Sequence, residues 1–272
     1  MKKLLIKILG LLVALIFIAT PSYAVTATFQ EGVDGYTGSL NIQIVSWAGN
    51  TQNTNINYYR DTRSNLFYWD ISSIPPGSII TDVTITLTLY ASYQNNDLRW
   101  GAVLDPDATG IWKEYPGSIQ YLYNSLSNYN YKEDDSVNLR WSGSSGTFAT
   151  VKGSTLGTVS VIADYNNEQI VDINAVALTT IVQNWADGTQ ANMGVWVEDT
   201  GTGNAKGRSK YYGTATSRPK LTVVYTAATC DANCSTCIDQ IECEASLFPC
   251  YWYSLSCNSE PESILRRMYL ME

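Results

Sequence analysis

The sequence contains no histidine. A Ser-His-Asp or Cys-His apparatus needs an imidazole as its base, so hydrolases of these types are excluded. A pair of carboxylates acting on a polysaccharide is the remaining catalytic possibility, and Glu114 with Asp134 or Asp135 is the nearest candidate pair. Because acidic residues near turns are usually only solvated, we expect a protein that is not an enzyme.

Cysteine is absent before residue 230, after which all six cysteines follow within a short tail. This contrast predicts two folding units, a body that buries a core and a small module that depends on covalent cross-links. Cys234-Ser-Thr-Cys237 has the spacing of a zinc knuckle, but a second knuckle and histidine ligands are missing, so we expect no metal. We expect disulfides among Cys230, Cys234, Cys237, Cys243, Cys250 and Cys257, whose pairing the sequence does not decide.

Long apolar runs are also absent, except at the N-terminus. Lysines flank an apolar run from Leu4 to Ala19, and small residues follow as far as Ala24. This pattern predicts a signal peptide over residues 1–24 with cleavage after Ala24, and hence a secreted or cell-surface protein. A retained membrane anchor is the alternative, although the run is shorter than the roughly 18–20 apolar residues that span a bilayer. No later segment is long and apolar enough to do so, and we expect no membrane span after cleavage.

Positive charge is scarce. The formal net charge is −8, and it becomes −11 once the three lysines of the predicted signal peptide are removed. Nucleic acids and anionic lipids are bound by basic patches, so we expect neither as a partner. The charge also favours a neutral or weakly charged polysaccharide over an acidic one.

The body, residues 25–226, is built from short runs of alternating polarity that are rich in β-branched and aromatic residues. In one run Val83, Ile85, Leu87 and Leu89 share a face, as in a strand with one buried side. Turn formers such as Pro75-Pro76-Gly77 separate the runs. The pattern predicts an all-β fold, a jelly roll or β-sandwich of two antiparallel sheets. The predicted strands include 40–45, 65–69, 79–90, 157–162 and 219–225.

One stretch of the body has helical spacing instead. From Ile173 to Trp185 the apolar positions recur every three or four residues, and Gly188 follows as a terminator. We predict a single short helix here, with Trp185 buried against the core.

Several segments, taken in order, resemble the DNRLRE domain. They are 28–36 (TFQEGVDGY), 66–80 (LFYWDISSIPPGSII), Trp112-x-Glu114, 182–188 (VQNWADG) with Asn192-x-Gly194, and 217–225 (SRPKLTVVY). The resemblance covers essentially all of residues 25–226. It implies an extracellular β-jelly roll known in part as a carbohydrate-binding module.

The chain departs from the pattern of this family at two places. Tyr68-Trp69 stands before Asp70 where many relatives have Arg-Phe, and Asn41 stands where relatives often have aspartate. A charged or metal-binding role is therefore not carried over to these positions. Asp70 is expected to cap a turn through its side chain.

Aromatic residues are abundant, with 19 tyrosines and eight tryptophans. The densest cluster interleaves tyrosine with asparagine, a combination suited to the apolar faces and hydroxyls of a neutral glycan. It is also the composition of an adaptable protein-binding loop, and Tyr121 and Tyr123 could instead pack inward. The candidate carbohydrate-binding residues are Tyr121, Tyr123, Tyr129, Tyr131 and Asn130.

These observations predict a signal peptide (1–24), a DNRLRE-like β-jelly roll (25–226), a disulfide module (227–259) and a tail (260–272). We expect no cofactor, although the oxygens of Asp105, Asp107, Asp134 and Asp135 could hold a structural calcium. The expected function is non-catalytic binding of a polysaccharide or surface glycan. An adhesion or assembly module that binds other extracellular proteins is the alternative, and a polysaccharide-degrading enzyme is the second alternative.

Overall fold

The computed structural model describes residues 24–45, 49–51, 56–59, 63–92, 94–104, 112, 151–164, 166–200, 205–227, 251–253 and 256–258. Residues Thr26–Tyr225 form one compact unit. Outside this unit, the described residues include an antiparallel hairpin of β13 (Tyr251–Tyr253) and β14 (Ser256–Asn258). Cys257 lies in β14, and the other five cysteines lie outside the described residues, so the predicted disulfides stay a prediction.

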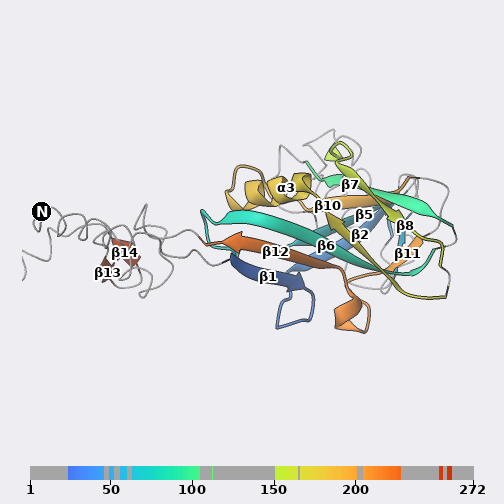
Figure 1. Ribbon diagram of the computed structural model, residues 1–272, viewed down its shortest axis with the longest axis horizontal. Helices are drawn as coiled ribbons and strands as arrows, with labels where there is room; N and C mark the ends of the chain where they lie inside the picture. The colour runs from blue at the N-terminus through green and yellow to red at the C-terminus, as the bar shows by residue number, and fades with distance from the viewer. Residues whose placement is uncertain are drawn as a thin grey trace, which may run out of the picture. The chain divides into compact units, whose positions relative to one another are not determined.

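Two six-stranded sheets make up the larger unit, and Figure 1 shows them as two layers. The first sheet has the order β1-β12-β6-β11-β4, with β9 also paired to β6. Its strands are β1 (Ala24–Gln30), β4 (Ile56–Tyr59), β6 (Ile79–Ala91), β9 (Gln169–Asn174), β11 (Ala205–Arg208) and β12 (Lys220–Thr226).

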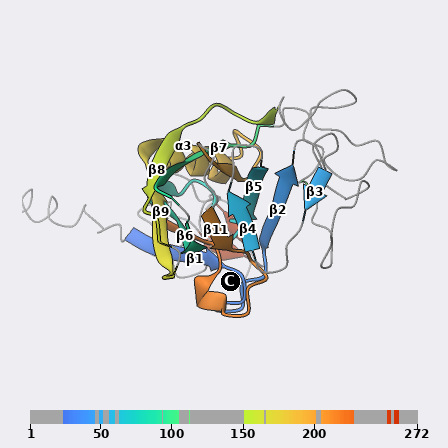
Figure 2. The ribbon, with the colours of Figure 1, turned by 90° about the vertical axis from the view of Figure 1, so that its right-hand side faces the viewer.

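The second sheet has the order β3-β2-β5-β10-β7-β8. Figure 2 shows β3, β2 and β5 of this sheet side by side. Its strands are β2 (Ser39–Val45), β3 (Gly49–Thr51), β5 (Arg63–Trp69), β7 (Asn96–Ala102), β8 (Gly157–Val161) and β10 (Val195–Asp199). The predicted all-β sandwich of two antiparallel sheets is confirmed.

The core between the sheets follows the alternation seen in the sequence. Val83, Ile85, Leu87 and Leu89 of β6 are at most 1% exposed. From the second sheet the inner face carries Phe67 and Trp69, whose rings stack with centroids 6.0 Å apart. Strand alternation therefore buries one side of β6, as its period of two predicts.

Amide side chains replace apolar ones in part of this interior. Asn57 of β4 donates to the Oδ1 atom of Asn41 of β2 over 3.0 Å, a hydrogen bond that joins the two sheets. Asn41 in turn donates to the Leu66 carbonyl over 3.0 Å. Because Asn41 faces inward, its neighbours Leu40 and Ile42 face the other side of the second sheet.

Helix α3 (Val176–Ala186) packs against β6 (Figure 1) and buries Leu178, Val182 and Trp185. The predicted helix is correct in kind, but its start is wrong, because Ile173 belongs to β9 and pairs with Ile85. An apolar residue in a strand that directly precedes a helix extends the apparent helical spacing. Gly188 terminates the helix as predicted, with φ +67° and a hydrogen bond from its N–H to the Trp185 carbonyl.

The turns predicted from residue type are present. The Asp70 carboxylate accepts a hydrogen bond from the Ser72 N–H over 2.9 Å, which confirms the capping role. Gly77 has φ +77° in the turn that leads to β6, where Ser78 N–H donates to the Pro75 carbonyl. Within the described ranges, no helix is long and apolar enough to cross a membrane.

Candidate functional site

The outer face of the second sheet is buried, which is unusual for a sheet in a two-layer sandwich. Ile42 pairs with Leu66, and Leu66 with Trp196, so these three side chains form a row on the side away from the first sheet. Each is at most 1% exposed. The outer cluster consists of Ile42, Ile44, Leu66, Val103, Trp112, Val151, Met193 and Trp196.

Burial on both faces explains the composition of the central strands. All five residues of β10 are buried, and four of the seven residues of β5 are buried in succession. A sheet that is covered on one side only would alternate buried and exposed positions. The residues that complete the cover are Val103, Trp112, Val151 and Met193, all of which lie outside the strands of the sheet.

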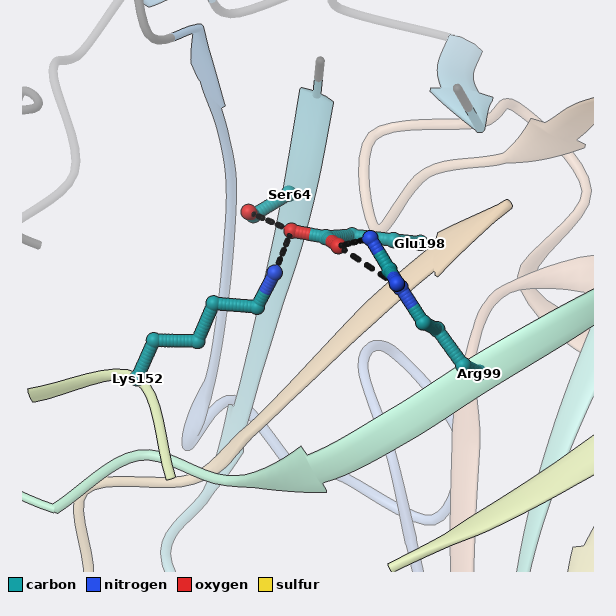
Figure 3. Close-up of polar contacts among 4 residues, drawn as sticks. All are labelled: Ser64, Arg99, Lys152 and Glu198. Atoms are coloured by element: carbon teal, nitrogen blue, oxygen red, sulfur yellow. Dashed lines mark hydrogen bonds and ion pairs between the residues drawn. The ribbon is translucent and has the colours of Figure 1, made fainter. Parts of the chain in front are cut away.

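A charged group borders this cluster. Glu198 of β10 is 2% exposed, and Arg99 of β7 and Lys152 both form ion pairs with it. The Arg99 guanidinium donates from Nε over 3.2 Å to the Oε2 atom of Glu198, and its Nη2 lies 3.1 Å from the same oxygen. Lys152 Nζ and the Ser64 hydroxyl both donate to Oε1. Figure 3 shows that Lys152 and Arg99 reach the carboxylate from opposite sides.

The cross-strand register places these groups together. Glu198 pairs with Arg99 across β10 and β7, so the two side chains share the outer face. Ser64 lies two residues before Leu66 on β5 and therefore points the same way. Lys152 arrives from the segment before β8, where it bridges to Val103. Opposite charges at facing positions neutralise a carboxylate that could not otherwise be buried.

Trp196 links the charged group to the apolar cluster. The Lys152 ammonium lies 4.3 Å from the centroid of the Trp196 ring, a cation–π contact. The indole lies across β7 at Gly101, where an added Cβ would come within 2.8 Å of the ring and 2.4 Å of the Ser154 carbonyl oxygen. Glycine at 101 is thus required by close approach rather than by its backbone torsion.

The described residues on either side of 105–150 lie together at this face. The Leu104 N–H donates to the Val151 carbonyl over 2.7 Å, which joins the two flanks of the segment. Trp112 is fully buried in the outer cluster, and its indole Nε1 donates to the Met193 carbonyl over 2.9 Å. The outer cluster therefore includes Val103 before this segment, Trp112 within it and Val151 after it.

The carboxylate of Glu198 has no free oxygen for proton transfer. Both oxygens of Glu198 accept hydrogen bonds from protein groups, and the carboxylate is buried, so it is poorly placed to transfer a proton to a substrate. The side chains of Arg99 and Lys152 are 35% and 24% exposed, so both are partly accessible to solvent. Within the part of the chain that the structure describes, no cluster of three or more acidic or cysteine side chains could hold a metal ion.

The residues predicted for carbohydrate binding all lie outside the described residues. They are Tyr121, Tyr123, Tyr129, Tyr131 and Asn130. The same holds for the carboxylates considered for catalysis or calcium, Glu114, Asp105, Asp107, Asp134 and Asp135. These expectations stay predictions.

The charged group on the outer face is not among the sites predicted from the sequence. A signal was present, because Glu198 lies within the apolar strand Val195–Asp199, where an acidic residue is unexpected unless it is paired. Its partners are far away in the chain, and only the register of β10 with β7 identifies Arg99. Trp112 was noted for family resemblance alone, and its anchoring role depends on the Met193 carbonyl.

No protein-family model matches the chain, and no curated protein matches it. The resemblance to the DNRLRE domain therefore stays a prediction, and the architecture defines the class of the protein as an all-β sandwich of two antiparallel sheets.

Proposed function

We propose that this protein is a secreted, non-catalytic module that binds a neutral or weakly charged polysaccharide. The tyrosine- and asparagine-rich segment between Tyr115 and Trp141 supplies the ligand-contacting rings and amides. The outer face of the second sheet, where Trp112 and Val151 on either side of this segment are buried, is the other part of the proposed site. Arg99 and Lys152 at the border of that face add donors for sugar hydroxyls.

The observation that carries the proposal is the anchoring of residues that bracket this segment. Trp112 precedes it and Val151 follows it, and both are buried in the same outer cluster. The Leu104 N–H and the Val151 carbonyl join the two flanks by a hydrogen bond at the same face.

A second candidate function, adhesion or assembly with other proteins, is favoured by one feature. Ile162 and Ile170 are 71% and 64% exposed at one edge of the sandwich, where β6 is the one described strand that pairs with β9. Exposed apolar residues beside an open strand edge are typical of protein contacts.

The test is a glycan array probed with the mature chain, residues 25–272. We expect binding to at least one neutral glycan class, and weaker binding by the variant Tyr129→Ala, Tyr131→Ala. Absence of binding to every glycan would refute the carbohydrate function. Binding that the variant leaves unchanged would refute only the assignment of these two tyrosines.

A further inference from the structure

A second aromatic surface lies on the outer face of the first sheet. Gly207 of β11 faces the core, where an added Cβ would meet the Tyr59 ring at 2.8 Å, so Arg208 faces outward. The Arg208 guanidinium is stacked between two rings, with its central carbon 4.2 Å from the Tyr90 centroid and 3.9 Å from the Tyr212 centroid. Tyr90 belongs to β6 and follows Leu89, which is buried in the core.

The charge of this arginine is balanced at the same place. Its Nε and Nη2 atoms donate to the Oε1 atom of Glu168 over 2.9 and 2.6 Å. Nη1 forms no hydrogen bond with another described residue, and the Arg208 side chain is 18% exposed, so Nη1 is the donor left for a ligand. A paired guanidinium adds donors to the surface without adding net charge.

The segment that carries Tyr212 is braced from two sides. Arg218 donates from Nε to the Tyr212 carbonyl over 2.7 Å and from Nη1 to the Glu31 carbonyl over 2.9 Å. Lys210 donates to the Ser39 carbonyl over 2.7 Å, and its ammonium lies 5.1 Å from the centroid of the Tyr211 ring. These contacts fix the segment after β11 against the turn between β1 and β2.

We infer that Tyr90, Arg208, Tyr211 and Tyr212 form a second binding surface, for the ring of a neutral sugar. Tyr211, next to Tyr212 in the chain, is 37% exposed, more than the other three residues, and supplies an accessible ring. Flat rings cover the apolar face of a pyranose, while an arginine donor beside them bonds its hydroxyls. Because Glu168 balances Arg208, the surface favours an uncharged ligand.

This surface and the site of the proposed function lie on the two opposite outer faces of the sandwich. The inference shares the ligand class of the proposed function but rests on different residues. A long polysaccharide that reaches one surface would raise the effective concentration at the other only if it could bend around the sandwich. Two separate chains could be held at once in any case, so the module would link neighbouring polysaccharide strands.

The test is affinity electrophoresis of the mature chain in gels that contain dextran, hydroxyethyl cellulose, galactomannan or a soluble β-1,3-glucan. The loop variant is Tyr211→Ala, Tyr212→Ala, and the segment variant is Tyr129→Ala, Tyr131→Ala. We expect the loop variant to lose about tenfold in affinity for a polysaccharide that retards the wild type, the effect of losing ring contacts. The matched control, Tyr211→Phe with Tyr212→Phe, keeps both rings and should retain most of the affinity.

The possible outcomes separate the two surfaces. Retardation that the segment variant loses and the loop variant keeps in all four gels would overturn this inference and leave the proposed function intact. Retardation lost in the loop variant alone would support the inference and refute Tyr129 and Tyr131 as ligand contacts. Migration of the wild type unchanged by all four polysaccharides would overturn both. If the loop variant unfolds at a lower temperature than the wild type, Tyr211→Ala alone, at an exposed position, replaces it. The same criteria then apply.

Discussion

Glu198→Gln tests the role of the charged group on the outer face. Glutamine has the shape of glutamate, and its amide oxygen can still accept hydrogen bonds from Ser64 and Lys152. Its amide nitrogen would face the Arg99 guanidinium, so two donors would meet where an ion pair stood. The substitution removes the only negative charge that this group places between the two cations.

The magnitude follows from the burial of the partners. A hydrogen bond to a charged group contributes about 1.5–3 kcal/mol, and losing one partner of a fully buried pair costs about 3–5 kcal/mol. Here the carboxylate is buried, but the Arg99 and Lys152 side chains are 35% and 24% exposed and can be partly rehydrated. We therefore expect a loss of about 2–3 kcal/mol in the free energy of unfolding, between the buried and surface cases.

The assay is urea denaturation at pH 7, followed by tryptophan fluorescence. The midpoint should fall while the dependence of the free energy on urea stays the same. Glu168→Gln is the matched control, because Glu168 also pairs with an arginine but is 44% exposed, and its loss should cost about 0–1 kcal/mol. Adding Arg99→Gln to Glu198→Gln should cost little more, since the two donors would no longer oppose each other. Equal midpoints for Glu198→Gln and Glu168→Gln would refute the reasoning.

Four further predictions concern the fold and the tail. Trp112→Phe loses the indole hydrogen bond to the Met193 carbonyl and leaves a gap, which should lower the free energy of unfolding by about 1–3 kcal/mol in the same urea assay; no change would mean that Trp112 is not an anchor. Gly194→Ala should lower the free energy of unfolding by more than about 2 kcal/mol, because φ is +79° and the new Cβ would lie 2.1 Å from the Phe67 carbonyl oxygen. Gly188→Ala, where φ is +67° and no atom lies within 4 Å of the added Cβ, should lower it by about 1 kcal/mol. Equal losses would contradict the steric argument. Burial raises the pKa of the Tyr59 hydroxyl above its ordinary value of 10.0, so Tyr59 ionises at a lower pH in the unfolded chain than in the folded protein. Its contribution to the free energy of unfolding is therefore complete below pH 10 and is lost as the pH rises further. Tyr59→Phe should reduce the fall of the urea midpoint at alkaline pH, and an unchanged fall would exclude Tyr59 as its source. Peptide mapping without reduction should show the six cysteines paired only with one another, and a free thiol in the secreted protein would contradict the predicted module.

Much of the fold could be predicted from the sequence because it depends on local alternation. The run from Val83 to Leu89 alternates strictly, and its apolar positions are the ones that the structure buries. The second sheet could not be read so directly, since β10 is buried on both faces and shows no alternation. Likewise, Ile173 carries no local mark that distinguishes the end of β9 from the start of a helix.

The candidate site was less predictable, because it depends on contacts between distant strands. The group around Glu198 needs the register of β10 with β7, and the stack at Arg208 needs residues from β6, β11 and the segment that follows β11. The composition of the chain indicated that tyrosine would be important. It could not indicate that Tyr90 and Tyr212 enclose one guanidinium.

The central claim, that a glycan binds over the outer face of the second sheet, is tested most directly by the indole N–H signals of the eight tryptophans. The measurement is a ¹H–¹⁵N correlation spectrum of the mature chain during titration with the glycan that binds best on the array. Trp112 and Trp196 lie in the outer cluster, whereas Trp69 and Trp100 face the core between the sheets and serve as internal controls. We expect the signals of Trp112 and Trp196 to shift in a saturable way and those of Trp69 and Trp100 to stay in place. Saturable binding without any shift of Trp112 or Trp196 would contradict the location, and the absence of saturable shifts anywhere in the spectrum with any glycan would contradict the function.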